Sequence, residues 1–439
     1  MNYKPQLICL TVASWILFPM LSQAENWPQW RGPGHNGIST EKGIPTQWST
    51  EKNVAWKISM PGQGGATPVV WGDRLFVTSA DGDDLVLICV DVTKGNVLWQ
   101  RKVSSGNQDA RAGEGNSASP SPSTDGEHVW VFFSTGVLAC YDFEGHENWK
   151  CNVADRFGKI DIQFGMTSTP VLHGDALYLQ LIHGAMVRDD NTRTGKVIKL
   201  NKLTGETIWE VDRVTDAQFE CKHSYASPFL YDHDGVQFLV VHGANCTTAH
   251  SLQTGAELWR FSNLNGPTDI NPGRYDPTFR FVASPGTANG KIIIPTAKEG
   301  PTVTLNVTSD SSGELSQQPS SIAWKLDRTP DVSIPLAVDN LVYLLHKDGR
   351  LQCVDLASGQ EKYFERTHSG QHRCSPLYVD GHIIYCGSKD GVCTVVKAGP
   401  EMQVVATNNM EAPITASPIV ANGTLYLRSY DYLYAIRAN

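Results

Sequence analysis

One unit recurs eight times along this chain, and it constrains the fold more than any other feature. Each copy starts at a proline, continues through an apolar strand to an Asp/Gly/Asn turn and enters a second strand, as in Thr67 to Val77 and Ser417 to Leu427. The starts lie 41 to 58 residues apart, at Pro68, Pro122, Pro170, Pro228, Pro285, Pro335, Pro376 and Pro418. That period fits four short strands with turns and indicates propeller blades.

The second half of the unit carries a glycine followed by an aromatic residue. The glycines are Gly95, Gly145, Gly205, Gly255 and Gly359, and the tryptophans at or near the corresponding position are Trp99, Trp149, Trp209, Trp259 and Trp324. Tyr363 replaces Trp in the sixth copy, and the fifth copy hides its turn within residues 308–321. We expect the glycines to adopt a positive φ in tight hairpins. The tryptophans would lie in outer strands and seal each blade against the next.

The two ends of the chain complement each other. The eighth copy stops at Asn439 after its third strand, whereas residues 53–58, with Trp56, are typical of an outer strand. Because sheets avoid open edges, we expect this strand to complete the ring. The sequence therefore predicts an all-β, eight-bladed β-propeller of four-stranded antiparallel blades over residues 53–439. Residues 25–52 would form an extended strap outside the ring.

The N-terminus predicts export. Lys4 precedes an apolar stretch over residues 7–21, and Ser22-Gln23-Ala24 matches the small-x-small pattern of signal peptidase sites. The stretch is too short and too interrupted to span a bilayer. Residues 1–24 are thus predicted to be a cleaved signal peptide, and the mature protein, starting at Glu25, to be secreted or periplasmic.

The net charge limits the classes of partner, and the positions of the cysteines limit the disulfides that can form. The net charge is −9, so a nucleic-acid partner is excluded. Four cysteines occupy repeat positions held elsewhere by Ala or another small residue, and we interpret them as packed thiols; they are Cys89, Cys140, Cys353 and Cys374. Cys386 and Cys393 flank a short turn and could be either bridged or free.

Long loops locate the candidate site. In a four-stranded blade, the links between blades and the links between the second and third strands emerge on one face, and here those links are long. The residues just before the repeat starts should come closest to the axis: Glu114, Asn116, Phe164, Lys222, His223, Arg280, His372 and Arg373. They would either bind a ligand at the tunnel mouth or be solvated, mutually paired loop side chains.

Acidic clusters supply no firm metal site. Residues 81–84 and 189–191 carry oxygen ligands suited to calcium, but such clusters are also ordinary hairpin turns. No metal site and no catalytic residue is assigned from the sequence.

The repeat, with its Ser/Thr-Pro, Asp-Gly, Thr-Gly and trailing Trp, resembles the PQQ-like repeat family over nearly all of residues 25–439. The opening Trp27-Pro28-Gln29-Trp30-Arg31-Gly32-Pro33 resembles that of secreted PQQ-like propellers. The resemblance implies one of two branches. One contains quinoprotein dehydrogenases with pyrroloquinoline quinone and calcium on the axis, and the other contains non-catalytic propellers such as the lipoprotein of the outer-membrane barrel-assembly machinery. The adjacent-cysteine pair of many of those dehydrogenases is absent from this sequence.

Two functions follow as hypotheses. The first is a non-catalytic binding or scaffold protein of the cell envelope, a monomer without a required cofactor, whose partner is a protein, an extracellular polymer or a small anionic ligand. The alternative is a PQQ- and calcium-dependent dehydrogenase acting on an alcohol or sugar. An anionic ligand is favoured because four cations lie near the predicted mouth against three carboxylates, an excess of one charge. The cations are Arg111, Lys222, Arg280 and Arg373, and the carboxylates are Glu114, Glu220 and Asp331. His223 and His372 are able to add charge below neutral pH.

Overall fold

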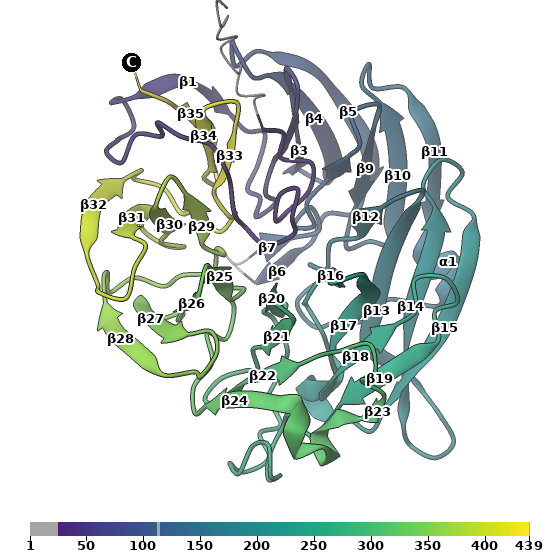
Figure 1. The fold of residues 1–439 in the computed structure, drawn as a ribbon. Coiled ribbons are helices and arrows are strands. Elements are labelled where there is room, and N and C mark those ends of the chain that lie inside the picture. Colours follow the sequence, from purple (N-terminus) through teal and green to yellow (C-terminus); the bar gives the residue numbers. More distant parts are fainter. Residues whose placement is uncertain (1–24, 112–114, 439) are drawn as a thin grey trace, which may run out of the picture.

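Eight sheets stand around a common centre in the computed structural model, which describes residues 25–111 and 115–438 (Figure 1). Each sheet contains four antiparallel strands that run outwards from the centre in chain order, except where noted below. The protein is an eight-bladed β-propeller, as the repeat period predicts. We number the blades 1 to 8 in the order of their innermost strands.

The first four blades cover the N-terminal half of the ring. Blade 1 consists of β2 (Val69–Trp71), β3 (Arg74–Asp81), β4 (Asp84–Asp91) and β5 (Val97–Ser105). Blade 2 consists of β8 (Ser123–Thr124), β9 (His128–Phe132), β10 (Val137–Asp142) and β11 (Glu147–Asn152). Blade 3 consists of β12 (Val171–His173), β13 (Ala176–Val187), β14 (Arg193–Asn201) and β15 (Thr207–Thr215). Blade 4 consists of β16 (Phe229–His233), β17 (Val236–Gly243), β18 (Cys246–His250) and β19 (Glu257–Phe261), with the short β23 (Gly313–Glu314) added in parallel to β19.

The remaining blades cover the C-terminal half. Blade 5 consists of β20 (Gly286–Ala288), β21 (Lys291–Ile294), β22 (Thr302–Asn306) and β24 (Ile322–Leu326). Blade 6 consists of β25 (Leu336–Val338), β26 (Leu341–Leu345), β27 (Arg350–Asp355) and β28 (Glu361–Arg366). Blade 7 consists of β29 (Leu377–Val379), β30 (His382–Cys386), β31 (Val392–Lys397) and β32 (Val404–Asn409).

Blade 8 combines both ends of the chain. It contains β33 (Ile419–Ala421), β34 (Thr424–Arg428) and β35 (Tyr432–Ile436), and its outer strand is β1 (Val54–Ser59). β1 pairs antiparallel with β35, with Lys57 opposite Tyr434. In Figure 1 the purple β1 accordingly lies beside the yellow β35.

Little other regular structure is present. The links carry α1 (Val153–Phe157), η1 (Phe219–Lys222), η2 (Leu315–Gln317), η3 (Pro319–Ser321) and the small hairpin of β6 (Asp109–Arg111) and β7 (Gly115–Asn116). Among the helices of the described ranges, none has the length and apolar character needed to cross a membrane. The predicted signal peptide over residues 1–24 lies outside the described residues.

Contacts between neighbouring blades explain the repeat motif. The Trp56 ring lies against Gly95 of the next blade, where an added Cβ would come within 2.6 Å of the ring, and Gly95 has a φ of 73°. The Trp56 Nε1–H donates to the carbonyl of Val92 at 2.8 Å. The same ring-on-glycine contact joins Trp99 to Gly145, Trp149 to Gly205, Trp209 to Gly255 and Trp324 to Gly359. Each glycine is therefore required both by its turn and by the neighbouring tryptophan.

Trp259 is the exception. It is buried like Trp56 and lies in outer strand β19, but its Nε1–H has no hydrogen-bond partner among the described residues. Blade 5 lacks the Asp-to-Gly turn that supplies the accepting carbonyl elsewhere, because residues 308–321 replace it with β23, η2 and η3. The irregular turn of the fifth repeat thus leaves the indole N–H of Trp259, in the fourth blade, without a hydrogen bond among the described residues.

The cysteines behave as packed thiols. Cys89, Cys140, Cys353 and Cys374 are buried, as predicted from their repeat positions. All nine cysteines in the described ranges are free. Cys386 and Cys393, for which the sequence left bridged and free alternatives open, lie directly opposite each other on β30 and β31 as free thiols.

The strap crosses the inner strands of the ring. Its residues exchange backbone hydrogen bonds with β2 through Trp27, with β8 through Pro28, and with β29 through Gly37 and Ser39. These strands belong to blades 1, 2 and 7. The prediction that the strap lies outside the ring is therefore wrong for residues 27–38. The physical reason is burial, since Trp27 becomes completely inaccessible to solvent in this position.

Candidate functional site: a funnel on the propeller axis

A cavity of about 460 Å³ lies on the axis of the propeller. Its lining includes residues from every blade or from the link that leads into it. Arg280 and Arg373 line it from the links that lead into the innermost strands, and we call this end its mouth. Trp30 lines it from the strap, which bonds to the innermost strands themselves, and we call this end its base. The volume is typical of small-molecule sites, which span roughly 300–1,000 Å³. We call this cavity the funnel.

A belt of hydroxyl groups surrounds the axis at the start of the innermost strands. The backbone N–H of Thr67 donates to the Ser121 Oγ at 3.0 Å, and the Ser121 N–H donates in turn to the Thr169 Oγ1 at 3.0 Å. Equivalent bonds continue around the ring: Thr169 to Ser227, Ser227 to Ser284, Ile334 to Ser375, Ser375 to Ser417 and Ser417 to Thr67. We call these residues the hydroxyl belt. It explains why Ser or Thr precedes the repeat proline.

The belt is interrupted at one place. In blade 6 the proline Pro335 follows Ile334, which has no hydroxyl group to accept from Ser284. Five belt residues line the funnel: Thr67, Ser121, Thr169, Ser375 and Ser417. Their Oγ atoms accept backbone N–H groups, and no described residue accepts their own hydroxyl hydrogens. The belt therefore offers hydrogen-bond donors to a molecule in the funnel.

The mouth of the funnel carries an excess of positive charge. Among the described lining residues four side chains are cationic, namely Arg280, Lys298, Lys347 and Arg373, and one, Asp331, is a carboxylate. That carboxylate is held by the Lys347 Nζ at 2.7 Å and by the Lys298 backbone N–H at 2.8 Å. Such a local excess in a recessed site attracts negatively charged molecules.

Carboxylates outside the lining hold two of these cations in place. Arg280 forms an ion pair with Glu220, and its guanidinium lies 4.7 Å from the centre of the Phe164 ring. The Lys298 Nζ donates to the Thr278 hydroxyl, and the Asp276 carboxylate lies 4.0 Å away. Arg280 and Lys298 are thus held in place by side chains outside the lining while they line the funnel.

The structure brings half of the predicted site residues to the funnel. Four of them line it: Phe164, Arg280, His372 and Arg373. Glu114 lies outside the described residues. The other three, Asn116, Lys222 and His223, are not in its lining. Asn116 is structural, since its Nδ2–H donates to the carbonyl of Gln63 and its Oδ1 accepts from the Ala118 N–H.

The two histidines do not add charge near neutral pH. Burial lowers the pKa of His372 to about 4 and, together with the charge of Lys222, lowers the pKa of His223 to about 4. Both rings are therefore neutral down to well below pH 6. The expected charge below neutral pH is therefore confined to pH values near 4 and below, because burial disfavours the charged form of both rings.

The acidic clusters considered as calcium sites are ordinary turns. Asp84 is bound by Lys102 at 2.7 Å and by the Ser105 hydroxyl, and Asp190 accepts from both the N–H and the hydroxyl of Thr192. Across residues 25–111 and 115–438, no group of three or more His, Cys, Asp or Glu is placed to hold a metal ion.

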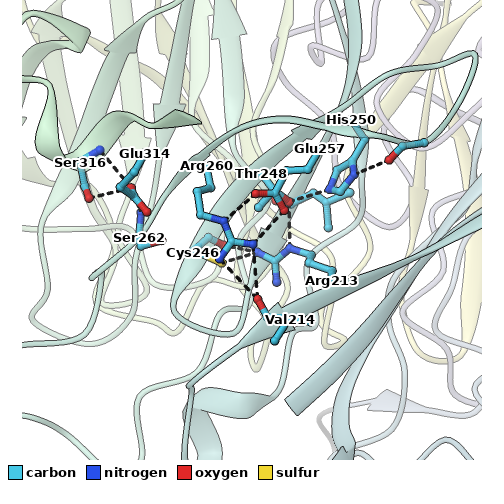
Figure 2. A network of polar contacts seen from close by, with 12 residues as sticks. Arg213, Val214, Cys246, Thr248, His250, Glu257, Arg260, Ser262, Glu314 and Ser316 are labelled. Carbon is cyan, nitrogen blue, oxygen red and sulfur yellow. Dashed lines mark hydrogen bonds and ion pairs between the residues drawn. The ribbon is translucent and has the colours of Figure 1, made fainter. Parts of the chain in front are cut away.

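A second polar cluster lies away from the funnel, between blades 3 and 4 (Figure 2). The buried Arg213 of β15 donates from Nε to the Thr248 Oγ1 at 2.8 Å and from Nη2 to the Cys246 carbonyl at 2.7 Å. His250 contacts the same Thr248 hydroxyl at 2.9 Å, and Glu257 binds Arg260 through both carboxylate oxygens. Its members bind one another across the blade interface, so we interpret this cluster as structural.

Sequence reasoning missed three important parts of the funnel. Lys298 and Lys347 lie in the links between the second and third strands of blades 5 and 6. The order of the strands places those links on the same face as the links between blades. The sequence argument used only the long links, so it passed over these two short ones. Trp30 could not be placed, because the strap has no repeat partner. The hydroxyl belt was visible in the sequence as the residue before each proline.

Comparisons with known proteins agree with this architecture. The family model described as outer membrane protein assembly factor BamB matches residues 39–187, 185–398 and 245–439. A polyvinylalcohol dehydrogenase from Pseudomonas sp. is 27% identical over 198 residues, which are 42% of this chain but only 28% of that protein. The outer membrane protein assembly factor BamB of Yersinia pestis is 23% identical over 304 residues, covering 65% of this chain and 71% of that protein.

Solved structures share the fold at low sequence identity. BamB from Moraxella catarrhalis superposes with a TM-score of 0.59 at 14% identity, covering 88% of this chain and 97% of that chain. Quinohemoprotein alcohol dehydrogenase from Comamonas testosteroni superposes with a TM-score of 0.64 at 12% identity, covering 93% and 80%. The matched family model spans most of the chain, and the protein therefore belongs to the PQQ-like repeat family described as outer membrane protein assembly factor BamB.

Proposed function

We propose that this protein is a non-catalytic binding protein of the cell envelope and that its funnel binds an anionic ligand. The observation that carries the proposal is the charge of the described funnel lining, four cations against one carboxylate, in a protein whose net charge is −9. Glu220 and Asp276, outside the lining, pair with two of those cations, so one positive charge remains in excess. Positive side chains are thus concentrated at this place against the overall trend of the molecule.

Backbone strain at the mouth supports the proposal. Lys298 and Asp331 both lie in the left-handed region, with φ of 54° and 72°. Non-glycine residues held in this region are concentrated at binding and active sites, where the surrounding structure maintains the strain. Here the strained backbone positions the Lys298 side chain and the Asp331 carboxylate, which in turn binds Lys347.

The proposed location in the envelope rests on the predicted signal peptide and on the similarity to the outer membrane protein assembly factor BamB of Yersinia pestis. A protein is the second candidate partner, because the relative from Yersinia pestis is named as an assembly factor. The small volume of the funnel favours a small ligand at the axis, and any protein would contact the surrounding long loops.

A PQQ- and calcium-dependent dehydrogenase is the alternative, and the similarity to a polyvinylalcohol dehydrogenase favours it. The cationic mouth would fit the carboxylates of pyrroloquinoline quinone. The described residues of the funnel do not fit calcium, which prefers six to eight oxygen ligands with several carboxylates. Asp331, the one carboxylate among them, is already held by Lys347 and Lys298.

The test is a comparison of two double variants by calorimetry with a panel of acidic ligands. Arg280→Ala with Arg373→Ala should weaken anion binding at least tenfold, because two charge-assisted contacts at about 1.5–3 kcal/mol each are removed. Arg74→Ala with Lys94→Ala, on the short-turn face, should leave binding unchanged. The proposal is wrong if the short-turn variant loses binding and the funnel variant keeps it, or if only neutral or cationic ligands bind.

Addition of pyrroloquinoline quinone and calcium tests the alternative directly. Under the binding-protein proposal, the purified protein reduces no redox dye with alcohols or sugars. Sustained dye reduction that requires the quinone would establish the dehydrogenase instead.

A further inference from the structure

The funnel is layered by chemistry along its depth. Its cations come from the loops at the mouth, with Arg373 two residues before the belt residue Ser375, and Arg280 four residues before Ser284. At the start of the innermost strands the lining consists of neutral Ser and Thr hydroxyls, and Trp30 lines the funnel from the strap, which bonds to those strands three residues beyond the belt. No ionisable side chain in the described lining belongs to this deeper level.

This layering restricts where a ligand can carry its charge. A carboxylate at the mouth would meet guanidinium and ammonium groups, whereas a carboxylate at the belt would meet only neutral hydroxyls and leave water at greater cost. The belt suits neutral hydroxyl groups, because each Oγ already accepts one backbone N–H, keeps its own hydrogen to donate and retains a second lone pair.

The base and walls add an apolar component. Trp30, Phe164, Tyr225, Val282 and Val332 line the funnel. Small-molecule sites of this kind bury carbon surface against aromatic rings and fix orientation with few polar groups. Inorganic phosphate or sulfate has no carbon surface to place there.

We propose that the ligand of the funnel is an acidic saccharide with its carboxylate at one end, a uronic acid alone or at the end of a short neutral oligosaccharide. Its carboxylate binds the cations of the mouth, its hydroxyls bind the hydroxyl belt, and the C–H face of a sugar ring packs against Trp30. This assignment rests on the proposed anion-binding function and names its ligand class.

The experiment measures affinities of the full chain for galacturonate, galactose, sulfate and pyrroloquinoline quinone by calorimetry. Galacturonate should bind at least tenfold more tightly than galactose, because only the former engages the charged mouth. Trp30→Leu should weaken galacturonate binding about tenfold and leave sulfate binding unchanged. Trp71→Leu, on the opposite face, is the matched control and should change neither.

The outcomes separate the two proposals. Binding of sulfate or of the quinone without galacturonate overturns the saccharide assignment and leaves anion binding standing. Absence of binding by every anion overturns both. If Trp30→Leu does not fold, saturation transfer from aromatic protons of the unaltered protein to the sugar ring protons replaces it. A saccharide that receives no such transfer does not reach the base, and the assignment is then wrong.

Discussion

A single indole N–H distinguishes two otherwise similar tryptophans. Trp324 and Trp259 are both buried in outer strands, but only Trp324 donates from Nε1, to the Leu356 carbonyl at 2.8 Å. The Trp259 N–H is buried without a partner among the described residues. Since an unpaired buried donor costs free energy, the two positions should respond differently to the same substitution.

Phenylalanine at each position tests this difference. Trp324→Phe removes a hydrogen bond and should lower the free energy of unfolding by about 1 kcal/mol more than Trp259→Phe, which removes only an unsatisfied donor. Both substitutions remove the same ring area, so each serves as the control for the other. Equal losses in denaturant unfolding experiments would contradict the interpretation.

Buried histidines predict acid sensitivity. Burial lowers the pKa of His242 to about 3 and that of His250 to about 4, from an ordinary value of 6.5. Because the unfolded chain takes up these protons at a higher pH than the folded chain, the free energy of unfolding should fall as the pH drops from about 6.5 towards 4. Each group contributes at most about 3 kcal/mol over this window.

Thermal melts between pH 7.5 and 4 measure the effect. The double variant His242→Gln with His250→Gln should show a shallower decline than the unaltered protein, since glutamine does not titrate. A parallel decline in both proteins would show that other groups cause the acid sensitivity.

At the scale of elements, β1 is the least local strand of the propeller. It pairs with β35 across almost the whole length of the chain, and Trp56 fastens it to blade 1 through the Val92 carbonyl. Deleting residues 53–58 removes a row of ladder hydrogen bonds, each about 1 kcal/mol net, and exposes the edge of β35.

The deleted protein should lose cooperative unfolding or aggregate. Calorimetry and light scattering check this, with Trp56→Phe as a milder variant that keeps the strand and loses only the indole bond. A deletion variant that melts within a degree or two of the unaltered protein would show that β1 is dispensable.

At the scale of the molecule, noncovalent contacts hold the ring, because the nine cysteines of the described ranges are free. We expect reductant to leave the melting temperature unchanged. The loss of a typical disulfide, roughly 2–4 kcal/mol, would lower it by several degrees. Such a drop would indicate that Cys386 and Cys393 are bridged in the purified protein.

The repeat made most of the architecture predictable. Gly95 and Trp56 could be assigned from sequence because their roles recur at fixed offsets in several blades. The site was only partly predictable, since a propeller gathers residues from distant loops and single side chains such as Lys222 turn away from the axis. Trp30 lies in a segment that occurs once, so no comparison between repeats could locate it.

Trp30 also connects the strap to the funnel. The strap bonds to the innermost strands of blades 1, 2 and 7, and the Trp30 side chain of the same segment is part of the funnel lining. A ligand that packs against Trp30 would therefore contact the N-terminal strap and the long loops at once, and its binding would stabilise both.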